Sequence, residues 1–443
     1  MIILLQYIIS FLSTYKILTT KGVNRFLWFM VSITLINTFF NVYNGIALTK
    51  GHLFFVIVFW ISLLIEGKHN IRRICSCPVI VPLAFVFLSY LLIGIFDTRL
   101  NPLVGGYRGT YNFMQSYGAF LLGWLSIRGN DNTAVLSKKL MRLSFIFTTY
   151  GFICFLIKSN PVVDGLGFQD RFVFENANAS FREFLVSGFL AESGVYGLSC
   201  FLCFLFILTY KQSKHRVYKL VLAFLFINIF LTATRSIMIP AIVGLALYAM
   251  MTYNVRDKLR YMFVGILIAI FVMICLPNSV GHYAQEIFAS IVDVLSPNGS
   301  GGAELGGSNL DVRKMQITTA FVKYLPQRLL FGHGFNFYQE VIFAHNNGVV
   351  DSELYGMESY LCFLGVEYGL INIISVVIFF ISLLCYFIKN RRTGGPSCIM
   401  GISYTLTYIL FLIFAYLGDS WLYAMPFLGL LVGLVERKKM GTK

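Results

Sequence analysis

Long apolar runs constrain this chain more than any other feature of its sequence. Each run covers roughly 16 to 22 residues, which is the length that an α-helix needs to cross about 30 Å of hydrocarbon. The runs are continuous, whereas the strands of a membrane β-barrel alternate apolar and polar residues. Charged residues make up only 12% of the 443 residues, against about 25% in a soluble domain. The sequence therefore predicts an all-α, polytopic membrane protein.

We expect about 12 to 13 transmembrane helices in one integral membrane domain, residues 1–443, with no second soluble domain. The first run is interpreted as a retained helix, because it lacks the basic leader and the small-residue cleavage site of a signal peptide. The predicted spans lie near residues 1–15, 26–46, 52–66, 78–96, 112–128, 141–158, 184–210, 217–232, 236–253, 260–277, 358–388, 397–417 and 420–436.

Basic residues divide the connections between these runs into two alternating sets. One set, from the connection at 16–25 to the C-terminus, holds 24 of the 35 Lys and Arg residues. Because short basic loops stay in the cytoplasm, the C-terminus is predicted inside, and the loops 159–183 and 278–357 outside. This bias accounts for the net charge of +15, so no nucleic-acid partner is expected.

Arg235 stands out in this topology. Between Lys219 and Tyr253 it is the only charged residue, and the flanks on both sides are basic. The stretch must then cross the membrane twice, which predicts that Arg235 lies at an outer turn and not at mid-bilayer, where a guanidinium is costly.

The long outer loop, 278–357, is the one extended polar segment. It begins with a tract rich in Gly and Ser at 296–308. Residues 311–330 follow, with apolar side chains at spacings that predict an amphipathic helix lying along the membrane surface. The short segment 105–109 (GGYRG), which contains Arg108, is predicted to be a turn.

The basic residues predicted on the outer face include Arg99, Arg108 and Arg328, and four further arginines stand out among them, although the positive-inside rule disfavours such residues there. A guanidinium presents a planar fork that suits bidentate contacts with phosphate. An outer arginine cluster therefore fits a lipid-linked pyrophosphate, although a headgroup contact or a salt bridge is the simpler reading for any one of them. The four are Arg171, Arg182, Arg235 and Arg313.

Three further residues are candidates for acid–base chemistry: Glu192, Glu358 and His345. Glu192 lies at the outer end of a span, where it fits a general base or an ion pair equally well. Glu367 stands nine residues after Glu358, about 900° of helical rotation, so the two face opposite sides. Glu358 is the better candidate, and a structural role is predicted for Glu367. No His, Cys, Asp or Glu group has the spacing of a metal site.

Four patches between residues 170 and 390 follow one another along the chain. The first is Arg182 with the segment 187–193 (SGFLAES), an arginine followed by a glycine-aromatic pair and a glutamate. The second is 231–236 (LTATRS), which places Arg235 before an apolar run.

The third patch is 311–313 (DVR), followed after the amphipathic stretch by 330–334 (LFGHG). The fourth is 358–361 (ESYL), which continues to 367–371 (EYGLI). In their order and shared outer location, the four patches resemble the O-antigen polymerase and ligase superfamily, the Wzy-type polytopic membrane glycosyltransferases. Where that family has Glu-Pro-Ser, this chain has AES at 191–193.

The resemblance implies transfer of a glycan from undecaprenyl pyrophosphate to an acceptor sugar hydroxyl, with no metal or other cofactor. Arg235 and Arg313 match the arginines that hold the pyrophosphate in the family, while Arg171 and Arg182 are candidates for steering the donor. In the ligases a histidine stands two to four residues before the Tyr-Leu of the fourth patch. This chain has none there, which favours a surface-polysaccharide polymerase of the bacterial inner membrane.

Two alternatives stay open. An O-antigen ligase would use lipid A-core as its acceptor. A flippase or transporter of lipid-linked oligosaccharide belongs to a different class, but transporters tend to have repeated halves and a midplane site, which this sequence lacks. The expected partners are the undecaprenyl-pyrophosphate-linked oligosaccharide, membrane lipids and a chain-length regulator.

Overall fold

The computed structural model describes most of the chain as helices. The described residues are 2–36, 51–127, 133–164, 186–190, 192–210, 216–232, 234–254, 256–257, 310–343, 352–354, 357, 359–415 and 420–441. Every regular element in these ranges is a helix. The all-α prediction is therefore confirmed for the described residues.

Among the residues that the structure describes, three helical segments are long and apolar enough to cross a membrane: Thr133–Ile157, Tyr360–Lys389 and Pro396–Phe414. Six shorter apolar helices, of 10–17 residues, accompany them. These helices bear out the membrane character of the sequence, while the count of about 12 to 13 spans stays a prediction. The predicted span 260–277 lies outside the described residues.

The helices of the first half are α1 (Ile2–Thr19), α2 (Val23–Ile36), α4 (Gly51–Ile65), α5 (Lys68–Cys75), α6 (Ile80–Ile95), α7 (Pro102–Gln115), α8 (Ala119–Ser126), α9 (Thr133–Ile157), α10 (Pro161–Asp164), α11 (Ser193–Thr209), α12 (Arg216–Leu231) and α13 (Arg235–Thr252). Most of these helices overlap predicted runs, whereas α5 and α10 lie between them.

The second half adds shorter π-helical and 3-10 turns to the α-helices. Its elements are α16 (Leu310–Thr319), η4 (Ala320–Tyr324), η5 (Leu325–Arg328), η6 (Tyr338–Phe343), η7 (Ser352–Leu354), α17 (Tyr360–Phe363), η8 (Leu364–Tyr368), α18 (Gly369–Lys389), α19 (Arg391–Gly394), α20 (Pro396–Phe414) and α21 (Ser420–Gly441).

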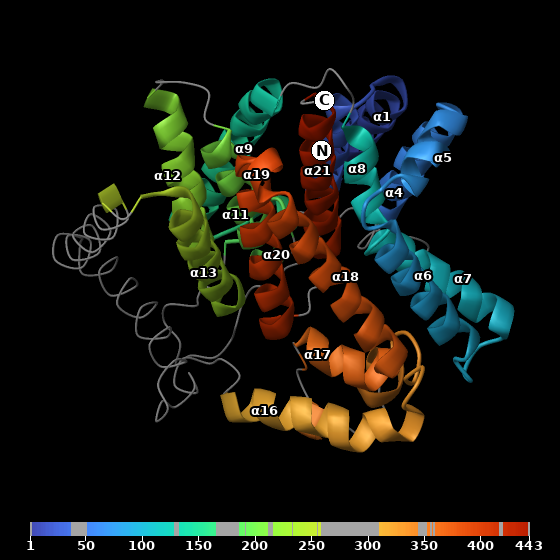
Figure 1. Ribbon diagram of the computed structural model, residues 1–443. Coiled ribbons are helices and arrows are strands. Elements are labelled where there is room, and N and C mark those ends of the chain that lie inside the picture. The colour runs from blue at the N-terminus through green and yellow to red at the C-terminus, as the bar shows by residue number, and fades with distance from the viewer. Residues whose placement is uncertain are drawn as a thin grey trace.

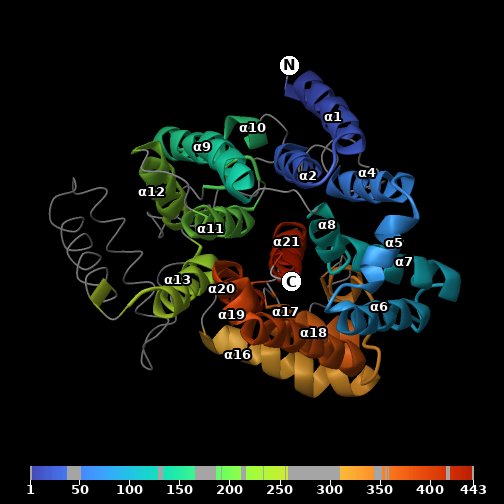
Figure 2. The same ribbon diagram turned by 45° about the horizontal axis from the view of Figure 1, so that its top comes forward.

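Helix α21 forms the centre of the bundle. Every residue from Ser420 to Val435 is buried, and Figure 2 shows the helix surrounded by its neighbours. It packs most closely on α8, where a Cβ on Gly123 would collide with the backbone at Pro426, and one on Gly429 with that at Phe120. Small residues therefore let these two backbones approach, as in membrane helix pairs.

Several basic connections gather at one end of the bundle. Lys438 donates to the carbonyl of Gly394 at 3.1 Å, which joins the end of α21 to α19. Arg391 donates to the carbonyl of Met251 at 3.1 Å, at the end of α13. Such cations suit the exposed carbonyls at helix C-termini. Both chain termini lie at this end in Figure 1.

The segment 310–328 lies across the opposite end of the bundle. It is helical throughout, as α16, η4 and η5, and Figure 1 shows it running across the ends of α18 and α20. It packs on α17, η7 and η8. The helix predicted at 311–330 is thus confirmed, and its position on a membrane surface stays a prediction.

Two predictions in the region 102–128 are wrong. The segment 105–109 is not a turn but part of α7, and the run 112–128 is not one helix but is interrupted at 116–118 between α7 and α8. The physical reason is close helix packing: a Cβ on Gly105 would collide with the backbone of Gly94, and one on Gly109 with that of Tyr90. The glycines therefore serve the contact between α6 and α7.

Candidate functional site

The predicted site residues fall into three groups in the structure. Arg171, Arg182, His345 and Glu358 lie outside the described residues. For Arg235 and Arg313 the structure gives only the helix in which each residue lies. For Glu192 it describes the side chain as well.

The structure brings the Glu192 and Arg235 positions together. Glu192 directly precedes α11, and Arg235 is the first residue of α13. The residues beside them are joined, because the hydroxyls of Ser193 and Thr234 share a hydrogen bond of 2.8 Å. Two of the four patches, separated by about forty residues in sequence, thus meet at one junction, and α11 also packs on α13.

The segment 186–190, which leads into this junction, is fixed on both sides. Asn160 donates to the carbonyl of Gly188 at 2.7 Å and to the hydroxyl of Ser187 at 3.1 Å. Gly188 has φ of 57°, and a Cβ there would collide with the ring of Tyr196. The glycine in this patch is therefore required both by its left-handed backbone and by the close approach of an aromatic ring.

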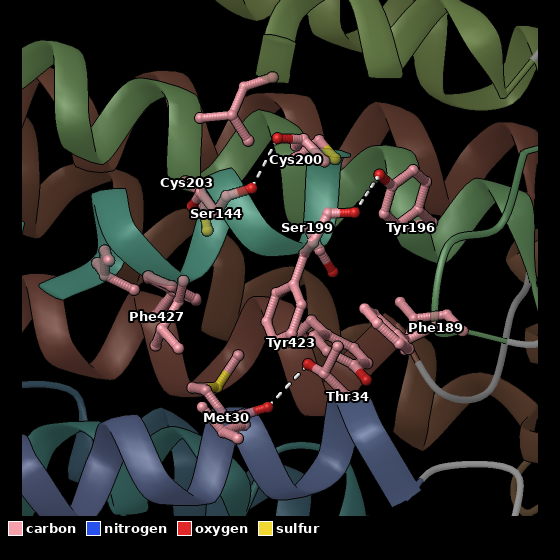
Figure 3. A pocket seen from close by; sticks show the side chains of 17 residues that line it. Met30, Thr34, Ser144, Phe189, Tyr196, Ser199, Cys200, Cys203, Tyr423 and Phe427 are labelled. Atoms are coloured by element: carbon pink, nitrogen blue, oxygen red, sulfur yellow. Dashed lines mark hydrogen bonds between the residues drawn. The ribbon is translucent and has the colours of Figure 1, made fainter. Parts of the chain in front are cut away.

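An apolar cavity lies beside this junction (Figure 3). Phe189 and Leu190, at the end of the segment just described, form part of its wall. The remaining lining comes from α2, α9, α11, α12 and α21 and includes Met30, Leu140, Cys200 and Phe427. The cavity is small, about 60 Å³, and its apolar lining does not suit a charged ligand.

Arg313 belongs to a different element, because it lies in α16. This helix packs against α17 and η7, and the hydroxyl of Thr319 at its end donates to Glu353 at 2.8 Å. Arg313 is thus on the layer that crosses the end of the bundle opposite the termini (Figure 1).

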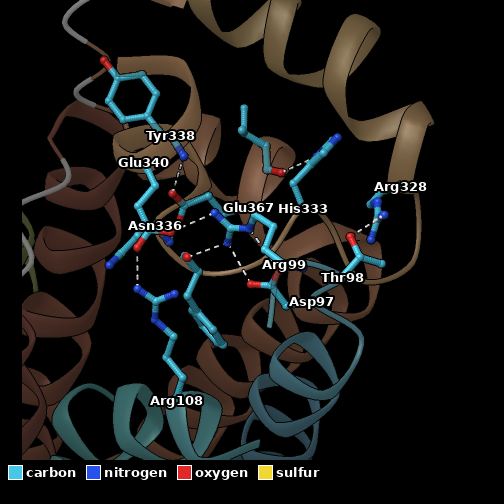
Figure 4. Close-up of polar contacts among 12 residues, drawn as sticks. Asp97, Thr98, Arg99, Arg108, Arg328, His333, Asn336, Tyr338, Glu340 and Glu367 are labelled. Carbon is cyan, nitrogen blue, oxygen red and sulfur yellow. Dashed lines mark hydrogen bonds and ion pairs between the residues drawn. The ribbon is translucent and has the colours of Figure 1, made fainter. Parts of the chain in front are cut away.

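A second cluster of charged residues joins the turn between α6 and α7 to the loop 334–340 (Figure 4). Arg99 is its centre: its Nε and Nη2 atoms donate to the two oxygens of Asp97 at 3.0 and 2.8 Å. Its Nη2 atom also donates to the carbonyl of Phe335 at 2.8 Å. Asp97 is buried, so this bidentate pair fixes the guanidinium in place.

Glu340 bridges Arg99 to a second arginine. One oxygen of its carboxylate accepts from Nη1 of Arg99 at 3.1 Å, and the other accepts from Nη2 of Arg108 at 2.6 Å. The Glu340 side chain is 46% exposed, against 23% for Arg99 and 25% for Arg108. One carboxylate at the surface thus separates two guanidinium groups.

Glu367 holds in place the segment that leads into η6, the π-helical turn that carries Glu340. Its buried carboxylate accepts the backbone N–H of Asn336 at 3.1 Å and that of Tyr338 at 3.0 Å. These contacts agree with the structural role predicted for Glu367. Gly334, with φ of 96°, packs on Asp97 so closely that a Cβ would collide with the carboxylate.

His333 and Arg328 complete the cluster. The ring of His333 makes a 2.9 Å hydrogen bond with the carbonyl of Val366, and Arg328 donates to the hydroxyl of Thr98 at 2.8 Å. Partial burial lowers the pKa of His333, and the charges of Arg328 and Arg99 lower it further, against the opposing effect of the Val366 carbonyl. The imidazole is therefore neutral at pH 7 and adds no charge.

The charge balance of this cluster depends on whether the carboxylate of Glu340 stays between Arg99 and Arg108. Burial lowers the pKa of Arg99, but Asp97, Glu340 and Glu367 together raise it above its usual value. The guanidinium groups of Arg99 and Arg108 contact the carboxylates of Asp97 and Glu340, of which only that of Glu340 is substantially exposed.

Sequence reasoning missed this cluster. Arg99 and Arg108 were placed on the outer face, but nothing in the sequence ties them to residues more than 200 positions away. One signal was present in the sequence: Gly105 and Gly109 form a small-xxx-small pattern, which predicts a closely packed helix pair. This pattern predicts that Arg108, which lies between the two glycines, is helical.

No metal site emerges from the part of the chain that the structure describes, where no three His, Cys, Asp or Glu side chains gather closely enough to hold an ion. The sequence matches no known family model, and a search of curated proteins finds no match.

Proposed function

We propose that this chain is a surface-polysaccharide (O-antigen) polymerase of the bacterial inner membrane. It moves the growing glycan from its undecaprenyl pyrophosphate carrier onto a new lipid-linked repeat unit. The reaction takes place at the end of the bundle where α16 lies, which the charge bias of the sequence assigns to the periplasm.

The observation that carries this proposal is the hydrogen bond between Ser193 and Thr234, at 2.8 Å. It joins the patch of Glu192 to the patch of Arg235, two of the four segments that resemble the superfamily. Their meeting supports the proposal, because residues of one site must lie close together.

The chemistry needs a base and a site for negative charge. The hydroxyl oxygen of the acceptor sugar attacks the anomeric carbon, the bond from that carbon to the pyrophosphate oxygen breaks, and undecaprenyl pyrophosphate leaves with the electron pair. The hydroxyl proton passes to a base, for which Glu192, Glu358 and His345 are the candidates. Arg235 and Arg313 hold the pyrophosphate as its charge grows.

The test is the surface-glycan ladder of cells that carry variants of this protein. Arg235→Ala and Arg313→Ala are each expected to reduce the long-chain ladder to a band with a single repeat unit. Lys314→Ala is the matched control, because Lys314 is the exposed neighbour of Arg313 and has no assigned role. Immunoblots of the membrane fraction show whether each variant accumulates normally.

The alternatives give different results. Long-chain glycan from both arginine variants would remove these residues from the mechanism. Loss of all attached repeats in a strain without the protein would point to a ligase or a flippase. An assay of the purified protein in vesicles then distinguishes a ligase from a flippase. A ligase joins glycan to lipid A-core, whereas a flippase makes no new glycosidic bond.

A further inference from the structure

Two arginines that the proposed function does not use converge on one surface carboxylate. Arg99 lies in the turn after α6 and Arg108 in α7, and Glu340 touches both with separate oxygens, at 3.1 and 2.6 Å. From this geometry we propose that Arg99 and Arg108 form a binding site for a diphosphate group, and that Glu340 closes the site until the ligand displaces it.

The two arginines differ in how firmly they are held. Arg99 keeps its position without Glu340, because Asp97 and the carbonyl of Phe335 bind it, and the ring of Phe337 lies 5.4 Å from its guanidinium carbon. Arg108, among the described residues, has Glu340 as its single hydrogen-bonding partner. The guanidinium of Arg99 is fixed, whereas that of Arg108 is held only by Glu340 among the described residues. A site made of these two groups can adjust to its ligand.

Glu340 can leave at low cost. Its side chain is 46% exposed, so water can replace the arginines as the partner of its carboxylate when it moves out. Once it moves out, the carboxylates of Asp97 and Glu367 remain near Arg99 and Arg108, and both are already occupied. Asp97 binds Arg99, and Glu367 binds two backbone N–H groups. The cluster then carries an excess of positive charge beside an open position.

A diphosphate fits this position better than a single carboxylate does. Glu340 offers one oxygen to each arginine, whereas a diphosphate offers several oxygens and more negative charge to two planar forks. The same group occurs free in solution and attached to an isoprenoid lipid. The site is made by the turn 96–101, α7 and the loop 334–340, so the inference does not depend on the roles proposed for Glu192 and Arg235.

The test is calorimetric titration of the purified full-length protein with inorganic pyrophosphate and, separately, with farnesyl diphosphate. Glu340→Gln keeps the size of the side chain and removes its charge, and we expect it to bind at least one of the two ligands about tenfold more tightly than the natural protein. Glu353→Gln is the matched control, because Glu353 is another exposed glutamate on the same end of the bundle and should leave the affinity unchanged.

A second substitution shows whether Arg108 takes part. Arg108→Gln in the Glu340→Gln background should return the affinity to that of the natural protein or below it. A stronger gain for farnesyl diphosphate identifies a lipid source of the ligand, and a stronger gain for pyrophosphate identifies a soluble one. Equal affinity in the natural protein and the Glu340→Gln variant for both ligands, or a double variant that binds as tightly as Glu340→Gln, overturns the proposal.

Discussion

Glu367 joins two parts of the chain that contribute different halves of the charged cluster. It lies in η8, at the start of the apolar segment 360–389, and its carboxylate accepts N–H groups from Asn336 and Tyr338. Its backbone carbonyl accepts a further N–H from Gly334, at 3.0 Å. A buried carboxylate is tolerated where such donors compensate for the loss of water. Glu367 thus positions the loop that presents Glu340.

Glu367→Gln is expected to lower the free energy of unfolding by about 1 to 3 kcal/mol. The amide group of Gln turns one acceptor into a donor, so that one of the two backbone N–H groups loses its partner. Thermal unfolding of the purified protein in detergent measures the effect. Glu340→Gln serves as the control, with a change of at most about 1 kcal/mol because its side chain is exposed. Equal changes in the two variants would show that the contacts of Glu367 add no stability.

At the scale of elements, the pair of α6 and α7 presents both Arg99 and Arg108. A hydropathy profile locates α6 well, because its apolar run is long and uniform. It misplaces α7, because that helix is rich in Gly and polar residues and its helical state depends on packing against α6. The same limit explains why the charged cluster was missed: the partners of Arg99 and Arg108 come from the loop 334–340, and only the tertiary fold brings them together.

The junction at Ser193 and Thr234 shows where sequence reasoning succeeds. The charge pattern alone predicted a break at Arg235 between two apolar helices, and in the structure α12 ends at Leu231 and α13 begins at Arg235. The patches also carried enough information to place Glu192 near a helix end. What the sequence could not provide was the contact between the two patches.

Neighbouring glycines of α7 allow a direct test of the helix contact. Gly105→Ala is expected to destabilise the protein by about 1 to 3 kcal/mol, because the added methyl group collides with the backbone of Gly94, which cannot move aside as a side chain can. Gly106→Ala is the matched control: its Cβ would meet only side-chain atoms of Ile95 and Leu91, at 3.5 and 3.7 Å.

For Gly106→Ala we expect a gain of about 0.5 to 1 kcal/mol, the usual benefit of Ala over Gly inside a helix. The midpoint of thermal unfolding in detergent measures both variants. If the two substitutions shift it in the same direction and by the same amount, close packing of α6 on α7 is not what Gly105 provides.

At the scale of the whole molecule, the bundle has two chemically different ends. Basic side chains bind helix carbonyls at the end that holds both termini, as Lys438 and Arg391 do. The other end carries α16 and the cluster around Arg99 (Figures 1 and 4). The positive-inside rule predicts that the first end faces the cytoplasm. The proposed polymerase reaction depends on this orientation, because it is assigned to the periplasmic side of the membrane.

Labelling of single cysteines in intact cells tests the orientation. The nine native cysteines are first replaced, and one cysteine is then introduced at an exposed position on each end, as Arg72→Cys in α5 or Lys314→Cys in α16. A maleimide that cannot cross membranes is expected to label position 314 in intact cells and position 72 only after the cells are permeabilised, because these two charged positions lie in water on opposite sides. Labelling of position 72 in intact cells, with position 314 protected, would invert the bundle and place the charged cluster in the cytoplasm. Glycan transfer at the α16 end would then have to use a carrier that is still on the cytoplasmic side of the membrane.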